Sequence, residues 1–163
     1  MFVIARALTY AALFIGLIFV YLPGRLLSWS GIAQPAATGP LQIAGMIIGG
    51  VGAVIALWCI FAFAAIGKGT PAPFDPPRRV VIEGPYRFVR NPMYIGATLG
   101  LAGAAIFYGS LSLSIYAASF LLVAHLFVIF YEEPALRKSF AAEYEAYCQR
   151  VRRWVPGRTR SAI

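Results

Sequence analysis

The sequence predicts an all-α integral membrane protein with about four transmembrane helices, a structured cytoplasmic loop and a C-terminal amphipathic helix in the membrane interface. Composition is the first reason: hydrophobic residues make up 60% of the 163 residues and charged residues only 12%, with a mean hydropathy of +0.75. Soluble domains carry about 25% charged residues. The second reason is that apolar runs of about 20 residues, the length that crosses a bilayer core, recur along the chain.

We expect one membrane domain over residues 1–163, with spans at residues 4–22, 41–66, 93–108 and 111–131. The first run follows Arg6 as a secretory signal would, but it is longer than the apolar core of a signal and no small-x-small cleavage site follows at once. The link at residues 109–111 is so short that the last two spans should form a tight antiparallel hairpin.

Basic residues orient these spans, because Lys and Arg accumulate at their cytoplasmic ends. Arg25 is the one basic residue in the first connection, and the third connection carries no charge. Both termini are therefore predicted to be cytoplasmic, where a net charge of +8 suits anionic lipid headgroups better than nucleic acid. The basic residues flanking the second, third and fourth spans are Lys68, Arg78, Arg79, Arg87, Arg90, Arg137, Lys138, Arg150, Arg152, Arg153, Arg158 and Arg160.

Small residues at a spacing of four mark where helices should pack closely. Such pairs occur in the second span, Gly45 and Gly49, and in the third, Gly96 and Gly100. Cys59 and Cys148 show no metal-ligand spacing, so neither a disulfide nor a metal site is expected.

Two further segments should be structured outside the spans. The proline-rich loop at residues 67–91 contains an apolar triplet at residues 80–82 and turn signals at Gly84-Pro85 and Asn91-Pro92, which predicts a cap on the cytoplasmic end. Residues 134–151 carry one apolar stripe at helical spacing, which predicts an interfacial helix; a plain basic anchor is the alternative. The stripe consists of Leu136, Phe140, Tyr144, Tyr147 and Val151.

The richest polar chemistry lies in residues 84–96, GPYRFVRNPMYIG. Asn91 and Pro92 form a helix start, because an asparagine side chain caps free N–H groups and proline fits the first turn. The same helix start, beside Arg87 and Arg90, would attract a carboxylate or a phosphate. Structural and binding roles both remain open for this segment.

Glu132 and Glu133 end the fourth span, at the depth where the third begins. They are either stop signals or need a cationic partner, an arginine of residues 84–96 or a ligand. His125 lies two turns inside the span and should be a neutral, hydrogen-bonded imidazole, with a place in a substrate pocket as the alternative. One cytoplasmic mouth should then combine cations, acids and aromatic rings suited to a zwitterionic, ring-bearing ligand.

Motifs from about residue 67 to residue 156 resemble the membrane methyltransferase family that includes isoprenylcysteine carboxyl methyltransferases and phospholipid N-methyltransferases. The matching motifs are GTPAP at residues 69–73, GPYRFVRNPMYIG at 84–96 and EEPAL at 132–136. The matching tail residues are Phe140, Tyr144, Tyr147, Val151, Trp154 and Pro156. Many relatives have histidine where this chain has Asn91, and an asparagine hydrogen-bonds but does not become charged.

The resemblance implies S-adenosylmethionine as cofactor. The cofactor-binding candidates are Tyr86, Arg87, Arg90, Asn91, Pro92, Tyr94, Gly96, Glu132, Glu133, Tyr144 and Tyr147. The candidates for catalysis are Arg90, Glu132, Glu133 and Arg152.

The acceptor class stays open at this point. A carboxylate acceptor would need a nearby arginine, Arg87, Arg90 or Arg152, whereas an amine would need Glu132 or Glu133 as a base. The membrane setting favours a lipid-like acceptor that arrives between helices. The alternatives to a methyltransferase are a non-catalytic scaffold or anion-binding bundle and a nicotinamide-dependent membrane reductase.

Overall fold

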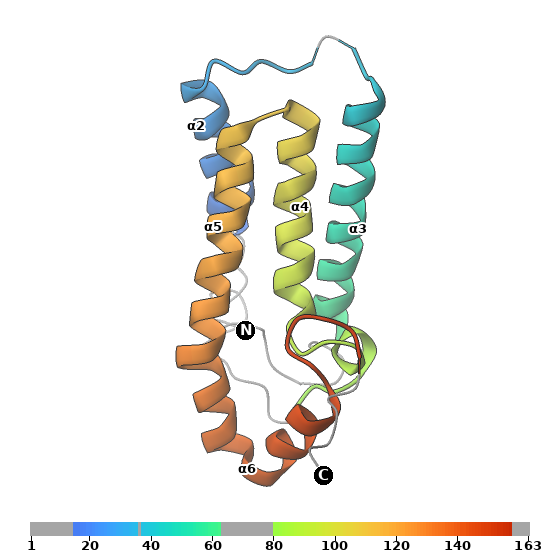
Figure 1. Cartoon of the computed structure of the whole chain (residues 1–163), viewed down its shortest axis with the longest axis vertical. Helices are drawn as coiled ribbons and strands as arrows, with labels where there is room; N and C mark the ends of the chain where they lie inside the picture. Colours follow the sequence, from blue (N-terminus) through green and yellow to red (C-terminus); the bar gives the residue numbers. More distant parts are fainter. Residues whose placement is uncertain (1–14, 36, 63–79, 158–163) are drawn as a thin grey trace, which may run out of the picture.

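The computed structural model describes residues 15–35, 37–62 and 80–157, which contain helices and no strands. Helices α2, α5, α4 and α3 stand in a row in that order, each in contact with the next (Figure 1). The bounds are η1 Leu17–Tyr21, α2 Leu22–Trp29, α3 Pro40–Ala62, η3 Gly84–Arg87, α4 Pro92–Tyr108, α5 Leu111–Phe127, η4 Val128–Glu132 and α6 Glu133–Arg150.

Two of these helices are long and apolar enough to cross a membrane: α3, and the continuous helical run Leu111–Arg150. Leu17–Trp29 and Pro92–Tyr108 are shorter apolar helices. The all-α class is therefore confirmed, and α4 has almost the bounds predicted for the third span. Residues 4–14 and 63–66 of the predicted spans lie outside the described residues.

The first helix continues to Trp29, beyond the predicted end of the first span at Leu22. Pro23 follows the π-helical turn η1, where the N–H of Leu22 bonds the carbonyl of Leu17 five residues earlier. Because proline lacks an N–H and crowds the carbonyl four residues before it, the wider turn accommodates it inside a helix.

The predicted hairpin between α4 and α5 is confirmed. Gly109 closes α4 in the left-handed conformation at φ 58°, which glycine adopts without strain. Ser110 then caps α5, because its hydroxyl accepts a hydrogen bond of 3.3 Å from the N–H of Leu113. The two-residue link places α5 antiparallel beside α4.

Helices α3 and α4 approach so closely at several glycines that no Cβ would fit there. A Cβ on Gly52 would lie 2.5 Å from the carbonyl oxygen of Gly96, and a Cβ on Gly45 would lie 2.6 Å from the backbone nitrogen of Phe107. The predicted close approach is confirmed at Gly45, Gly49 and Gly96, whereas a Cβ on Gly100 would meet nothing within 4 Å. Gly52 and Gly103 take part in the contact instead.

Helix α6 continues directly from α5 through the π turn η4, in which the Glu133 N–H bonds the Val128 carbonyl just before Pro134. The predicted helix over residues 134–151 is present as α6, but it is not straight, because Ala141 has φ 35° and ψ −112° and bends it sharply. The bend turns the second half of α6 back under the bundle (Figure 1). There Tyr144, Tyr147 and Val151 of the predicted stripe pack on Val80, with Leu136 and Phe140 beside them.

The predicted cap is described from Val80 onward. Val81 and Tyr86 are buried against Cys59 and Ala62 at the end of α3. Gly84 adopts φ 59° where a Cβ would meet the Trp58 ring, and it opens the short 3₁₀ helix η3. The GTPAP motif, Lys68, Arg78 and Arg79 lie outside the described residues.

Candidate active site

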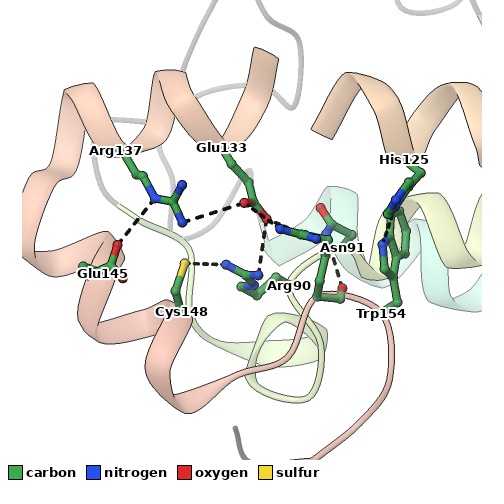
Figure 2. A network of polar contacts seen from close by, with 9 residues as sticks. Arg90, Asn91, His125, Glu133, Arg137, Glu145, Cys148 and Trp154 are labelled. Atoms are coloured by element: carbon green, nitrogen blue, oxygen red, sulfur yellow. Dashed lines mark hydrogen bonds and ion pairs between the residues drawn. The ribbon is translucent and has the colours of Figure 1, made fainter. Parts of the chain in front are cut away.

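The polar groups gather at the end of the bundle where α3 ends, α4 begins and α5 passes into α6, around the buried carboxylate of Glu133 (Figure 2). Arg153 binds it through two atoms, at 2.7 Å from Nε to Oε1 and 2.9 Å from Nη2 to Oε2. Arg90 lies 3.3 Å from Oε1 and Arg137 lies 4.0 Å from Oε2. Three separate segments of the chain thus supply arginines to one carboxylate.

These arginines decide the charge of Glu133, which lies beyond the predicted span 111–131. Burial on its own would raise the pKa of the Glu133 carboxyl, but the hydrogen bonds from Arg153 and the charges of Arg90, Arg153 and Arg137 lower it overall. Glu133 is therefore ionised and fully paired. A carboxylate held in this way organises the site and is a poor proton acceptor.

Glu132 has the opposite environment although it is the next residue. Within the described part of the chain its hydrogen-bond partner is Tyr94, whose hydroxyl donates to Oε2 at 3.0 Å. Burial raises the pKa of the Glu132 carboxyl; the Tyr94 hydrogen bond lowers it and the Glu133 charge raises it, for a net increase. Adjacent groups with pKa values pushed apart are typical of sites that transfer protons.

Arg90 connects the start of α4 to α6 and the tail. Its Nη1 donates to the Sγ of Cys148, and its backbone N–H donates to the Arg152 carbonyl at 2.9 Å. Its Nε is buried and has no hydrogen-bond partner among the described residues. A buried donor without a partner is rare and marks a place where a ligand oxygen would be stabilised.

The tail contributes a residue that the sequence did not single out. Arg152 was the predicted candidate, but its side chain is exposed and only its backbone carbonyl meets the site. Arg153 makes the contact with Glu133. Helical phase could not choose between them, because α6 ends at Arg150 and Val151 is extended, with φ −123° and ψ 129°.

Asn91 does not cap α4 with its side chain, which corrects the sequence interpretation. Its Nδ2 donates instead to the Arg153 carbonyl at 3.2 Å, while Pro92 occupies the first turn as expected. The predicted hydrogen-bonded imidazole is confirmed, since Trp154 Nε1 donates to His125 Nδ1 at 2.9 Å. Residues 153 and 154 therefore tie the start of α4 to α5 (Figure 2).

The remaining predicted residues lie around this cluster. The Tyr147 hydroxyl donates to the Tyr86 carbonyl at 2.6 Å, and Tyr86, Tyr144 and Tyr147 are all buried in packing. Burial raises the pKa of all three hydroxyls, which keeps them neutral. Gly96 serves the α3 contact, and the exposed Arg87 stacks over the Phe88 ring at 4.6 Å. The structure thus brings together Arg90, Asn91, Tyr94, Glu132 and Glu133.

This donor set fits the charged part of S-adenosylmethionine. The unpartnered Nε of Arg90 suits a carboxylate, and the half-buried Glu132 carboxylate suits an ammonium or the positive sulfonium. Both groups lie next to Glu133, whose charge is paired with arginines.

Comparison with known families agrees with this chemistry. Residues 41–143, more than half of the chain, match the family model of the phospholipid methyltransferases. No curated protein and no solved structure matches the chain. The match selects the methyltransferase over the scaffold and reductase alternatives. The chain belongs to the phospholipid methyltransferase family, whose members are membrane enzymes that transfer a methyl group from S-adenosylmethionine to phospholipid-type or isoprenylcysteine-type acceptors.

Proposed function

We propose that this methyltransferase binds S-adenosylmethionine beside Arg90, Tyr94 and Glu132 and methylates the amine of a lipid-like acceptor. The proposal rests on the different environments of the two adjacent glutamates, Glu132 and Glu133. Glu133 is neutralised by arginines, whereas Glu132 faces a tyrosine hydroxyl and keeps a raised pKa. Glu132 is therefore the group in this cluster that is suited to take a proton.

An amine acceptor fits the arginines better than a carboxylate acceptor does. Arg90 and Arg153 are paired with Glu133, and Arg87 is exposed and stacked on Phe88. Arg152 also points to solvent. Arg153 is bidentate on Glu133, and the remaining donor of Arg90, its Nε, is the one that suits the carboxylate of the cofactor. The described arginines of this cluster therefore leave little capacity for a carboxylate acceptor.

The reaction then requires little covalent chemistry from the protein. When bound, the cofactor supplies an electrophilic methyl group on sulfur. Glu132 would first take a proton from the ammonium of the acceptor, which leaves a neutral amine with a free electron pair on nitrogen. That nitrogen would bond to the methyl carbon while the carbon–sulfur bond breaks and its electron pair stays on sulfur. Tyr94 orients Glu132, and the carbonyls of Arg152 and Arg153 hold Arg90 and Asn91, so the chain would mainly position the reactants.

Four spans with both termini in the cytoplasm complete the proposal. The basic tail and the polar cluster would then share the cytoplasmic face, where the cofactor arrives from solution. Labelling of single cysteines introduced at Ser30 and Gly157 with a membrane-impermeant maleimide tests this arrangement in sealed cells. We expect Ser30→Cys to react from outside and Gly157→Cys only after permeabilisation; the reverse pattern contradicts the topology.

Calorimetric titration of the detergent-purified protein with S-adenosylhomocysteine tests the cofactor site. We expect Tyr94→Phe to weaken binding about two- to tenfold, the effect of one lost hydrogen bond. Tyr131→Phe is the matched control, because Tyr131 is exposed and contacts Phe127 through its ring. Equal affinities for the two variants, or no binding to folded wild-type protein at millimolar ligand, would overturn the site.

Transfer of radiolabelled methyl groups tests the acceptor. Dioleoylphosphatidylethanolamine offers an amine, and N-acetyl-S-farnesylcysteine offers a carboxylate. We expect turnover of the amine lipid, lost in Glu132→Gln and kept in Glu143→Gln, whose residue is exposed. Turnover of the farnesylcysteine alone would reject the amine acceptor and leave the methyltransferase activity in place.

A further inference from the structure

Residues 151–154, here called the tail strap, follow α6 and form hydrogen bonds through three consecutive residues. The Arg152 carbonyl accepts from the Arg90 N–H at 2.9 Å, and the Arg153 carbonyl accepts from Asn91 at 3.2 Å. The last contact is the hydrogen bond of 2.9 Å from Trp154 to His125. The strap therefore links α4 to α5 at the end opposite the Gly109–Ser110 turn.

The contact between Trp154 and His125 lies at apolar depth. His125 comes six residues before Tyr131, the last residue of the apolar stretch 111–131, and is therefore about 9 Å inside it. The polar cofactor would not extend there, but the hydrocarbon chain of an amphipathic acceptor would. An acceptor with its amine at Glu132 passes His125 about two helical turns further into the membrane.

The geometry of this contact suits a latch better than permanent core packing. The two rings are only partly buried, their centroids are 5.7 Å apart and their planes are tilted by 42°. One directed hydrogen bond joins them, from Trp154 Nε1 to His125 Nδ1. The ion pairs of Glu133 within the described residues involve neither Trp154 nor His125.

We propose that Trp154 and His125 form a latch on the membrane side of the active site, and that the hydrocarbon chain of the acceptor is admitted when this latch opens. The inference rests on the proposed placement of the site. The closed latch competes with the lipid chain for the same space. Weakening the latch therefore raises the fraction of molecules that are ready to bind the lipid, and the apparent affinity rises with that fraction.

Kinetics with Trp154→Phe test the latch, since phenylalanine keeps an aromatic ring and removes the N–H donor. We expect the KM for dioleoylphosphatidylethanolamine to fall about two- to tenfold, with the Kd for S-adenosylhomocysteine unchanged. The water-soluble headgroup phosphoethanolamine should show no change in KM. Trp29→Phe is the matched control, because Trp29 is exposed and is the last residue of α2, outside the proposed site. A purely structural Trp154 would instead raise the lipid KM and weaken cofactor binding.

Substitution of His125, the hydrogen-bond partner of Trp154, provides a second and independent test of the latch. His125→Phe should lower the lipid KM as Trp154→Phe does, and the double variant should go no further, because both changes remove the same hydrogen bond. His125→Asn places an acceptor oxygen near the position of Nδ1 and should restore the wild-type KM. Additive effects of the two substitutions, or no rescue by asparagine, would reject the latch.

Hydrogen exchange of the Arg90 amide, which donates to the Arg152 carbonyl of the strap, tests the latch without turnover. Addition of dioleoylphosphatidylethanolamine to the wild-type protein should accelerate exchange of this amide, and Trp154→Phe should show fast exchange before lipid is added. An exchange rate that is the same with and without the lipid would contradict the latch. Retained binding of S-adenosylhomocysteine in that experiment would leave the proposed cofactor site standing, whereas its loss in wild-type protein would remove both.

Discussion

Helix α4 meets its two neighbours through very different interfaces. Against α3 it presents glycines, and the two backbones touch with no room for a methyl group. Its N-terminal end meets α6 and the tail strap through charged and polar side chains that span several ångströms to reach Glu133 and Glu132. The glycine interface contains no titratable group and should not respond to pH. The polar end depends on charges, so its stability should change with pH.

Removal of the Glu133 charge should be the most damaging single change to the polar end. Glu133→Gln leaves Arg90 and Arg153 without their counter-charge, and breaking a buried ion pair on one side costs about 3–5 kcal/mol. Thermal unfolding in detergent should show a large fall in Tm together with loss of S-adenosylhomocysteine binding. Glu145→Gln, at an exposed pair with Arg137, is the control and should change stability by less than about 1 kcal/mol. Equal effects of the two variants would contradict the central role of Glu133.

The glycine interface can be tested with one methyl group. Gly52→Ala places a Cβ 2.5 Å from the Gly96 carbonyl oxygen, and overpacking of this kind destabilises by about 1–3 kcal/mol. Gly50→Ala is the same substitution two residues earlier, where the Cβ meets nothing within 4 Å. It should be neutral or stabilise the helix by up to about 1 kcal/mol. The unfolding temperatures of the two variants decide the matter, and a tolerated Gly52→Ala would mean that α3 and α4 lie further apart.

The two glutamates should respond to pH in opposite directions. The lowered pKa of Glu133 gives stability that is present above the ordinary carboxyl value of 4.5 and is lost as the pH falls through the lowered value. The raised pKa of Glu132 favours the folded state at low pH, and this contribution is lost as the pH rises through the raised value.

Glu132→Gln should therefore increase Tm near neutral pH while methylation of the amine lipid is abolished. Wild-type activity should rise with pH through the raised pKa of Glu132. Tm curves and rate profiles measured on the same preparations check both expectations. A Glu132→Gln variant that is active with an unchanged pH profile would show that Glu132 takes no proton.

The smallest effect should come from Asn91, which joins the polar end to the tail strap by one hydrogen bond. Asn91→His keeps a donor and restores the residue that many relatives have, so fold and S-adenosylhomocysteine affinity should stay within about threefold of wild type. Asn91→Ala removes the donor to the Arg153 carbonyl and should weaken affinity about two- to tenfold. An Asn91→His protein that cannot be extracted in folded form would contradict this expectation and show that histidine is not tolerated at this position.

Local patterns in the sequence predicted the parts of the fold that depend on neighbouring residues. The short link at Gly109 and Ser110 required a hairpin, and the spacing of Gly45 and Gly49 indicated a close helix contact. Extending that spacing by three residues reaches Gly52, so a signal for it existed. The apolar stripe of residues 136–151 was also present, but no residue type announced the bend at Ala141.

The site was harder to predict because its contacts join distant segments. The sequence placed Glu132, Glu133 and Arg90 at one end of the bundle, and the structure brings them together there. It could not decide that the Asn91 side chain would leave its own helix for the Arg153 carbonyl. It could not choose Arg153 over Arg152 either, since the extended Val151 resets which way the following side chains point.

The pairing of Glu133 with Arg153 also sets the order in which the contacts of Glu133 form during synthesis. Arg153 lies twenty positions after Glu133, and every apolar helix precedes it in the chain. During translation Glu133 therefore emerges with Arg90 as its earlier partner and gains its two-atom contact only when the tail is made. We therefore expect a newly made chain to bind S-adenosylmethionine at the proposed site only after residues 151–154 have folded back onto Glu133.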